Sequence, residues 1–162
     1  MNADPYATVE QADAYFNARI NSAEWDGFTA EEKPKLLLAA SDYIDFSYNF
    51  KGSKTDALQM REFPRTGIQG VDPSKIPDRV IYACCELALM AGKNAAEGGS
   101  GLDVDVKEMA ETRVRVDVIE VEYDAGLLAK YRQGSGTGLN QTVDNLLRPF
   151  LEVVTGSRML RG

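Results

Sequence analysis

The sequence predicts a mainly α protein, a four-helix bundle with a β-hairpin insertion between the third and fourth helices. Apolar residues recur at helical spacing in four segments, and two capping patterns mark helix starts. After residue 103, apolar and charged residues alternate as in a strand. The 162 residues, 44% of them apolar, suffice for one domain and are too few for two. We therefore expect a single helical domain over residues 1–151, with the hairpin at about 104–124, followed by a tail over 152–162.

Two capping patterns predict the first two helices. Thr8 and Thr29 each begin a Ser/Thr-x-x-Glu/Gln box in front of an amphipathic stretch. Because such boxes supply hydrogen bonds to the free N–H groups of a helix start, helices are expected over 8–19 and 30–47. The connector between these helices carries two large apolar residues that we expect to plug the ends of the helical core: Trp25 and Phe28.

A third helix is expected over 77–95, with Pro77 in its first turn. This segment is apolar almost all round, which is typical of a helix buried on most sides. It therefore forms either the centre of the bundle or a contact between subunits. The third helix has one polar stripe, formed by residues spaced seven apart: Arg79, Glu86 and Lys93.

A fourth helix is expected over 139–151, with a kink or an early end at Pro149.

Alternating apolar and charged residues predict strands in one region only, between 104 and 124. The apolar parity flips between Val118 and Ile119, which a single regular strand does not allow. Two strands forming a hairpin, roughly 106–116 and 119–124, explain this flip. A single bulged strand is the alternative.

A long irregular stretch, from Phe50 to Ile76, separates the second and third helices and is rich in glycine and proline. Connections of this length are unusual in a compact domain and are often binding loops. Its large apolar residues suggest that it packs on the helices rather than projecting into solvent: Leu58, Met60, Phe63 and Ile68.

The residue types exclude most catalytic chemistry. The chain has no histidine, which rules out Ser-His-Asp and Cys-His catalysis and His-ligated zinc. Cys84 and Cys85 are adjacent in an apolar stretch and are expected to be inert reduced thiols, with a redox pair as the alternative. Gly52-Ser53-Lys54-Thr55 lacks the contiguous Gly-Lys-Ser/Thr of a phosphate-binding loop. We expect no enzyme activity, no catalytic residue, no metal and no cofactor.

Charge and aromatic residues argue against a general nucleic-acid binder. Acidic residues outnumber basic ones by 25 to 18, and the formal charge is −7. This balance disfavours broad contact with a phosphate backbone, although it leaves a local basic patch open. Most aromatic residues lie in amphipathic helices, where packing accounts for them, so no stacking platform for a single strand is expected. No apolar run is long enough to span a membrane.

The middle of the chain carries a more specific signal. It reads Phe50-Lys51-Gly52-x-Lys54-Thr55, then Gln59-x-x-x-Phe63-Pro64-Arg65-x-Gly67, then Ile76-Pro77-x-x-Val80. This series resembles a family of small tailed-bacteriophage proteins encoded among the head genes. They are head–tail connector proteins, also called adaptor or head-completion proteins, and many are labelled DnaT-like. The resemblance extends over roughly residues 5 to 151.

The connector resemblance implies a structural virion protein at the phage neck. It would form a ring-shaped homo-oligomer, twelvefold, on the portal vertex, extending the DNA channel and providing the tail attachment surface. The implied partners are the portal protein, tail or neck proteins, other copies of the chain, and passing double-stranded DNA bound without sequence specificity; no membrane is involved. The implied location is the head–tail interface of the virion, after synthesis in the bacterial host cytoplasm.

The DnaT-like label implies a different function, that of a single-stranded DNA-binding replication accessory protein. We favour the connector at this stage, because an acidic chain is a poor binder of phosphates.

Two groups of residues are candidates for function. By resemblance, the tail is expected to dock on the portal, with apolar residues filling grooves and arginines meeting carboxylates: Val153, Val154, Arg158, Met159, Leu160 and Arg161. The loop that carries the family motif is either an intrachain clamp on the bundle or a contact with a neighbouring subunit: Gln59, Phe63, Pro64, Arg65 and Gly67.

Overall fold

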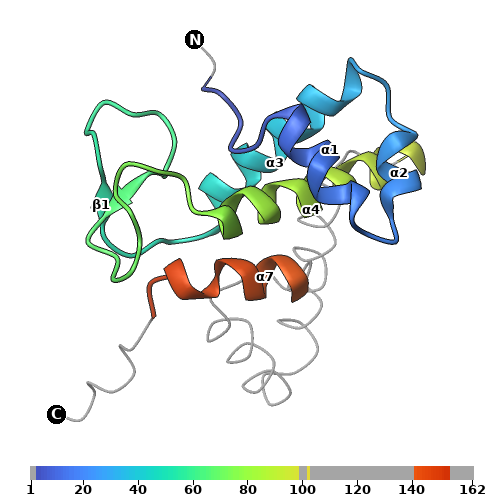
Figure 1. Cartoon of the computed structure of the whole chain (residues 1–162). Helices are drawn as coiled ribbons and strands as arrows, with labels where there is room; N and C mark the ends of the chain where they lie inside the picture. Colours follow the sequence, from blue (N-terminus) through green and yellow to red (C-terminus); the bar gives the residue numbers. More distant parts are fainter. Residues whose placement is uncertain (1–2, 99–101, 103–140, 154–162) are drawn as a thin grey trace, which may run out of the picture.

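A computed structural model of the chain describes residues 3–98, 102 and 141–153. This part is mainly helical, as expected, with five α-helices, one 3-10 turn and one small antiparallel sheet (Figure 1). The elements in chain order are α1 (Val9–Asn17), α2 (Ser22–Asp26), α3 (Glu32–Ser47), β1 (Ser53–Lys54), β2 (Arg65–Thr66), α4 (Asp78–Ala96), α7 (Gln141–Leu147) and η1 (Arg148–Phe150).

Both predicted capping boxes are present. Thr8 Oγ1 accepts a hydrogen bond from the Gln11 N–H at 3.2 Å, and the Gln11 side chain accepts one from the Thr8 N–H at 2.9 Å. Thr29 and Glu32 make the same reciprocal pair, at 3.2 and 2.8 Å, in the turn that leads into α3. The predictions for the first two helices are therefore confirmed, although α1 ends two residues before the predicted end at 19.

The connector between these helices contains the short helix α2, which the periodicity did not predict. Trp25 lies on it and is fully buried, stacked on Phe16 with ring centroids 5.0 Å apart. The indole Nε1 donates a hydrogen bond to Asp13 at 2.7 Å. Trp25 thus plugs the core, as predicted, and its burial explains why this short segment adopts a defined turn of helix.

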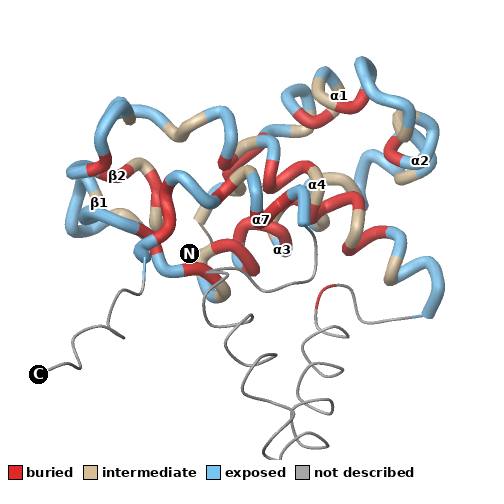
Figure 2. The backbone as a smooth tube through the Cα atoms, turned by 90° about the horizontal axis from the view of Figure 1, so that it is seen from below, coloured by how far each residue is buried: buried red, intermediate tan, exposed pale blue. Residues whose placement is uncertain are grey.

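The third predicted helix, α4, is the centre of the fold. It packs against α1, α3 and α7, and both cysteines on it are buried. Figure 2 shows buried residues concentrated where α3, α4 and α7 meet. A position inside one chain therefore explains the apolar circumference of this helix. Gly92 sits where α4 contacts the ring of Phe28, and any side chain there would collide with that ring.

The fourth predicted helix ends early, as the proline suggested. α7 stops at Leu147 and the 3-10 turn η1 follows, with Pro149 inside it. The chain beyond it is held by a β-bridge between Phe50 and Leu151, and the Glu152 N–H donates to the Asn49 carbonyl at 2.9 Å. The end of the domain is thus tied to the start of the long loop.

The expectation that strands occur only between 104 and 124 is wrong. β1 and β2 pair inside the long loop, with Ser53 opposite Thr66 and Lys54 opposite Arg65. The turn at Gly52 makes this possible, because its φ of 72° suits glycine and a Cβ there would lie 2.1 Å from the Thr66 carbonyl oxygen. The predicted hairpin at 104–124 lies outside the described residues.

The four-helix bundle is confirmed only at the coarser level of a mainly helical fold. In the described part, α2 is an additional helix and the loop with its small sheet packs at one end of α3 and α4 (Figure 1). Within that same part, no helix is long and apolar enough to cross a membrane.

Candidate functional site

The loop with the family motif is held together by a buried arginine. The Arg65 side chain is nearly fully buried. Its guanidinium donates to the backbone carbonyls of Lys51 and Gly52, both at 2.8 Å, and to that of Phe50 at 3.3 Å. It also donates to the carbonyl and the carboxylate of Glu62. A planar donor with five N–H groups satisfies this many acceptors at once, which explains why arginine stands here.

The other motif residues complete the same clamp. Gln59 Nε2 donates to the carbonyls of Arg61 and Pro64, both at 2.9 Å, and its Oε1 accepts from the Asp56 N–H. Phe63 precedes a cis peptide bond to Pro64 and is buried. Its ring packs against three other aromatic rings: Tyr6, Phe50 and Phe150. Gly67 provides a second turn, at φ 86°.

The structure thus brings Gln59, Phe63, Pro64, Arg65 and Gly67 together in one cluster that supports the intrachain clamp. The expectation for the apolar residues of this loop is half right. Phe63 and Ile68 are buried, whereas Leu58 and Met60 are 89% and 59% exposed.

A second buried arginine fastens the N-terminal segment to this clamp. Arg61 Nη1 donates to Asp42 at 2.8 Å and to Asp45 at 2.9 Å, and its Nε donates to the Asp4 carbonyl at 2.8 Å. Asp45 also accepts a hydrogen bond from the Tyr6 hydroxyl. Burial, followed by this hydrogen bond, raises the pKa of Tyr6 well above its ordinary value. The side-chain donors of Gln59, Arg61 and Arg65 are therefore turned toward the chain itself.

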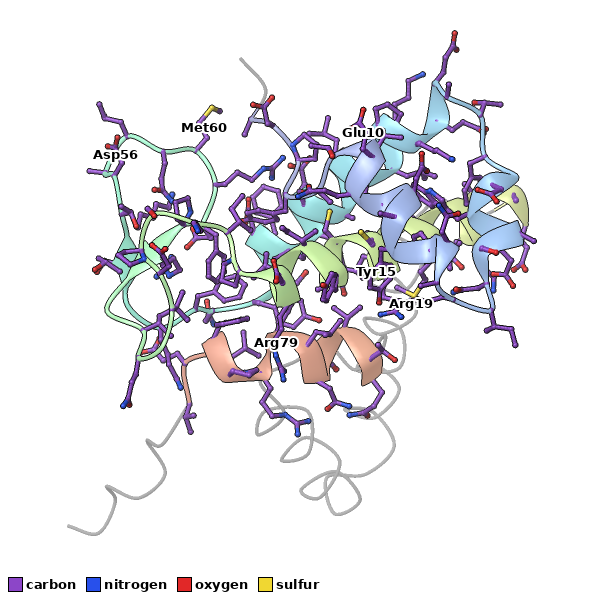
Figure 3. All side chains as sticks on the ribbon, in the orientation of Figure 1. Glu10, Tyr15, Arg19, Asp56, Met60 and Arg79 are labelled. Carbon is purple, nitrogen blue, oxygen red and sulfur yellow. The ribbon has the colours of Figure 1, made fainter. Side chains whose placement is uncertain are left out.

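An aromatic–arginine stack lies on the opposite part of the molecule, between α1 and α4. The rings of Tyr15 and Tyr82 stack with centroids 4.9 Å apart and an interplanar angle of 29°. The Arg19 guanidinium carbon lies 3.8 Å from the Tyr15 ring centroid. Tyr82 is 37% exposed, and Arg19 and the neighbouring Ile20 are exposed. Tyr15 and Arg19 are labelled in Figure 3. Within the described part of the chain, this is a surface where ring faces and a cation lie together.

A carboxylate orients the inner ring of the stack. The Tyr15 hydroxyl donates to Glu86 Oε1 at 2.7 Å. Burial, and then the hydrogen bond to Glu86, raises the pKa of Tyr15 to about 12. Tyr82 and Glu86 are four residues apart, so both lie on the polar stripe of α4 that begins at Arg79. Tyr82 and Glu86 are thus one helical turn apart on α4, whereas Tyr15 lies on α1 and Arg19 lies just beyond the end of α1.

Sequence reasoning missed this stack. It assigned Tyr15 to packing and did not single out Tyr82, and the contact joins residues far apart in the chain. The one available signal was that Tyr82 falls on the stripe of Arg79 and Glu86, where an otherwise apolar helix is polar.

Some of the described cations have no carboxylate close by, although acidic residues outnumber basic ones over the whole chain. Five basic side chains have a carboxylate oxygen within 4 Å: Lys33, Lys54, Arg61, Arg65 and Lys93. Six others have none among residues 3–98, 102 and 141–153: Arg19, Lys35, Lys51, Lys75, Arg79 and Arg148. Arg19, the cation of the stack, is one of these six.

The described residues offer no metal or thiol chemistry. No group of three potential ligands from His, Cys, Asp and Glu is found in this part of the chain. Cys84 and Cys85 are buried, and burial raises the pKa of Cys84 to about 11 and that of Cys85 further still. Both thiols stay protonated at neutral pH, which fits the prediction of inert cysteines.

The structure describes only the first two residues of the predicted tail over 152–162, Glu152 and Val153. Val153 is 61% exposed. The remaining candidates lie outside the described residues: Val154, Arg158, Met159, Leu160 and Arg161.

A family model described as "Putative DnaT-like ssDNA binding protein" matches residues 1–162, and the chain belongs to this family. No curated protein and no solved structure matches the chain.

This membership overturns the interpretation as a head–tail connector. The portal protein, the tail or neck proteins, the twelvefold ring and the passing double-stranded DNA all depended on that interpretation and are withdrawn with it. The error came from giving the net charge more weight than the local basic patch that it left open. In the described part, a carboxylate oxygen lies within 4 Å of five basic side chains and of none of the other six, and the exposed Tyr82 stacks on Tyr15.

Proposed function

We propose that this protein binds single-stranded DNA, and that bases of the strand stack on the exposed ring of Tyr82 beside Tyr15 and Arg19. The membership of the whole chain in the DnaT-like family carries the proposal. The stack supports it, because its geometry meets the physical requirement of single-strand binding: ring faces at the surface next to a cation.

The stack favours unpaired bases over duplex. In a duplex the faces of each base are covered by its neighbours, so a protein ring gains no stacking contact without unstacking a step. In a single strand the bases are free to stack, and each base–ring contact contributes about 1–3 kcal/mol. Arg19 adds a cation next to the ring and can approach a phosphate.

The overall charge makes the interaction salt-sensitive and modest in affinity. The formal charge of −7 repels a polyanion at long range, so binding depends on the few unpaired cations and on the rings. The protein acts by binding rather than by chemistry. We also propose that the fold is a four-helix bundle with a hairpin insertion at 104–124. We propose that the protein has no enzyme activity. Its location in the virion remains a prediction from the sequence.

The test measures binding of labelled single-stranded and duplex oligonucleotides by fluorescence anisotropy at ~50 mM salt, where phosphate contacts are strong. We expect the single strand to bind more tightly than the duplex. Tyr82→Ala should weaken single-strand binding by about 5- to 150-fold, the equivalent of about 1–3 kcal/mol.

Tyr82→Phe is the matched control, because it keeps the ring face and should keep the affinity. Absence of single-strand binding by the wild-type chain at this salt would refute the function. Equal binding by wild type and Tyr82→Ala would place the contact elsewhere on the protein.

A further inference from the structure

We infer that three cations at the junction of α4, α7 and the long loop bind the phosphates of the strand. We call Lys51, Arg79 and Arg148 the junction cluster. This inference rests on the proposed function and deepens it, because it assigns a second contact region with a different chemistry from the aromatic stack.

Two backbone contacts bring the junction cluster together. Arg79, in the first turn of α4, reaches the Asn145 carbonyl on α7 at 3.4 Å. Lys51 Nζ reaches the Pro149 carbonyl, also at 3.4 Å, and Arg148 is its neighbour in the chain. The two carbonyls are four residues apart, roughly 6 Å along the α7–η1 axis. The Arg79 and Lys51 side chains therefore meet the α7–η1 segment little more than one helical turn apart, and Arg148 lies between these two points in the chain.

The arrangement of the helices explains this convergence. α4 and α7 run antiparallel, so the beginning of α4 lies beside the end of α7 (Figure 1). The backbone of Lys51 pairs with that end, since its N–H donates to the Phe150 carbonyl at 2.8 Å. Segments far apart in the sequence thus place positive charge at one corner.

The charges of the junction cluster are not neutralised by the described residues. All three side chains belong to exposed residues, and none has a carboxylate oxygen within 4 Å in the part of the chain that the structure describes. The contacts of Lys51 and Arg79 are to neutral carbonyls at the long limit of hydrogen bonding. By contrast, Arg61 and Arg65 have carboxylates at 2.5–2.9 Å and are buried. The junction cluster keeps its donors for a ligand.

The junction cluster and the stack lie on one face of α4. Arg79 precedes Tyr82 by three residues, which places the two side chains on one stripe with about 4.5 Å of rise between them. Figure 3 shows Arg79 and Tyr15 along the same edge of α4. Successive nucleotides of a strand are separated by a distance of the same order, about 3.4 Å in stacked form. A strand following α4 can place a base on Tyr82 and a neighbouring phosphate at Arg79.

A competing explanation is that these cations only complement the carbonyl end of α7. Basic side chains near a helix C-terminus stabilise the exposed carbonyls by a few tenths of a kcal/mol to about 1 kcal/mol. That role would affect folding and leave the salt dependence of DNA binding unchanged. One experiment therefore distinguishes phosphate binding from stabilisation of the end of α7.

The experiment measures the dissociation constant for a single-stranded oligonucleotide of about 20 nucleotides, longer than the sites of about 4–16 nucleotides that single modules occupy. It compares wild type with the triple variant Lys51→Gln, Arg79→Gln, Arg148→Gln between ~50 and ~200 mM salt. Each lost phosphate contact lowers the slope of log affinity against log salt by about 0.7. The slope should therefore fall by about 2, and wild type should lose about twentyfold more affinity than the variant over this range.

Lys35→Gln is the charge-matched control for Arg79→Gln, because Lys35 is also exposed and unpaired in the described residues but lies on α3. It should leave the slope unchanged, whereas Arg79→Gln should lower it by about 0.7. If the triple variant does not fold by circular dichroism, these two single variants decide the question.

If wild type binds the oligonucleotide and the slope of log affinity against log salt is the same in wild type and variants, the junction cluster does not bind phosphates. The proposed function would not be affected by that result. A lower melting temperature with an unchanged slope would lead to the same conclusion and support the helix-end explanation. Absence of binding by wild type would overturn the proposed function and this inference with it.

Discussion

Replacing Arg65 should destabilise the fold more than replacing any exposed cation. Arg65→Ala leaves the carbonyls of Lys51, Gly52 and Phe50 without this donor and removes the nearer of the two cationic partners of Glu62. Each buried polar group that loses its partner costs about 1–3 kcal/mol, and breaking a buried ion pair costs about 3–5 kcal/mol in total. Since water can reach part of the loop, we expect about 3–5 kcal/mol.

This loss is large enough to measure by thermal and urea denaturation followed by circular dichroism. For a chain of this length, 1 kcal/mol corresponds to about 2–4 °C, so the melting temperature should fall by about 6–20 °C. Arg65→Lys keeps the charge but has fewer donors, and should fall between Arg65→Ala and wild type. Arg148→Ala, an exposed cation, should stay within about 0.5 kcal/mol of wild type.

The clamp interpretation fails if Arg65→Ala costs less than about 1 kcal/mol. It also fails if the variant is stable but loses single-strand binding, because the loop would then be a contact surface rather than a clamp.

Two further predictions concern packing and pH. Gly92→Ala should cost about 1–3 kcal/mol in urea denaturation, because its Cβ would lie 2.3 Å from the Phe28 ring, and adding Phe28→Leu should recover part of the loss. Stability should also fall in alkali: the folded-state pKa of Tyr15, about 12, exceeds its ordinary value of 10.0, so its contribution is complete below pH 10 and is lost as the pH rises through 12. Urea midpoints at intervals from pH 9 to 12 should decline less steeply for Tyr15→Phe than for wild type, and parallel curves would exclude this group as the cause.

The local elements were predictable because their causes are local. A capping box is four residues long, and Thr8 with Gln11 forms its hydrogen bonds whatever the rest of the fold does. Pro149 ends α7 for an equally local reason, since its ring cannot continue the hydrogen-bond ladder. α2 escaped prediction because five residues are too few for periodicity, and the burial of Trp25 stabilises it through contacts with α1.

The sequence identified the loop that carries the family motif, but it did not show whether this loop is an intrachain clamp or a contact with a neighbouring subunit. Gln59, Phe63 and Arg65 stand out in the sequence, yet the same residues suit an interface and a clamp equally well. Only the folded loop shows that their donors and rings point inward. Likewise, β1 and β2 are two residues each, too short to show alternation, and their pairing follows from how the clamp closes the loop.

By itself, the sequence predicted where α1, α3, α4 and α7 lie, because the helical pattern depends on the spacing of neighbouring residues. It did not predict α2, and it left open whether α4 is buried inside one chain or between subunits. Only the tertiary structure decided which charges are neutralised and which rings reach the surface. Tyr15 meets Tyr82, and Arg79 reaches α7, across long stretches of chain. Net charge and aromatic content describe the whole chain. Binding depends instead on which charged and aromatic side chains lie exposed together at one site, and the packing of the chain determines this.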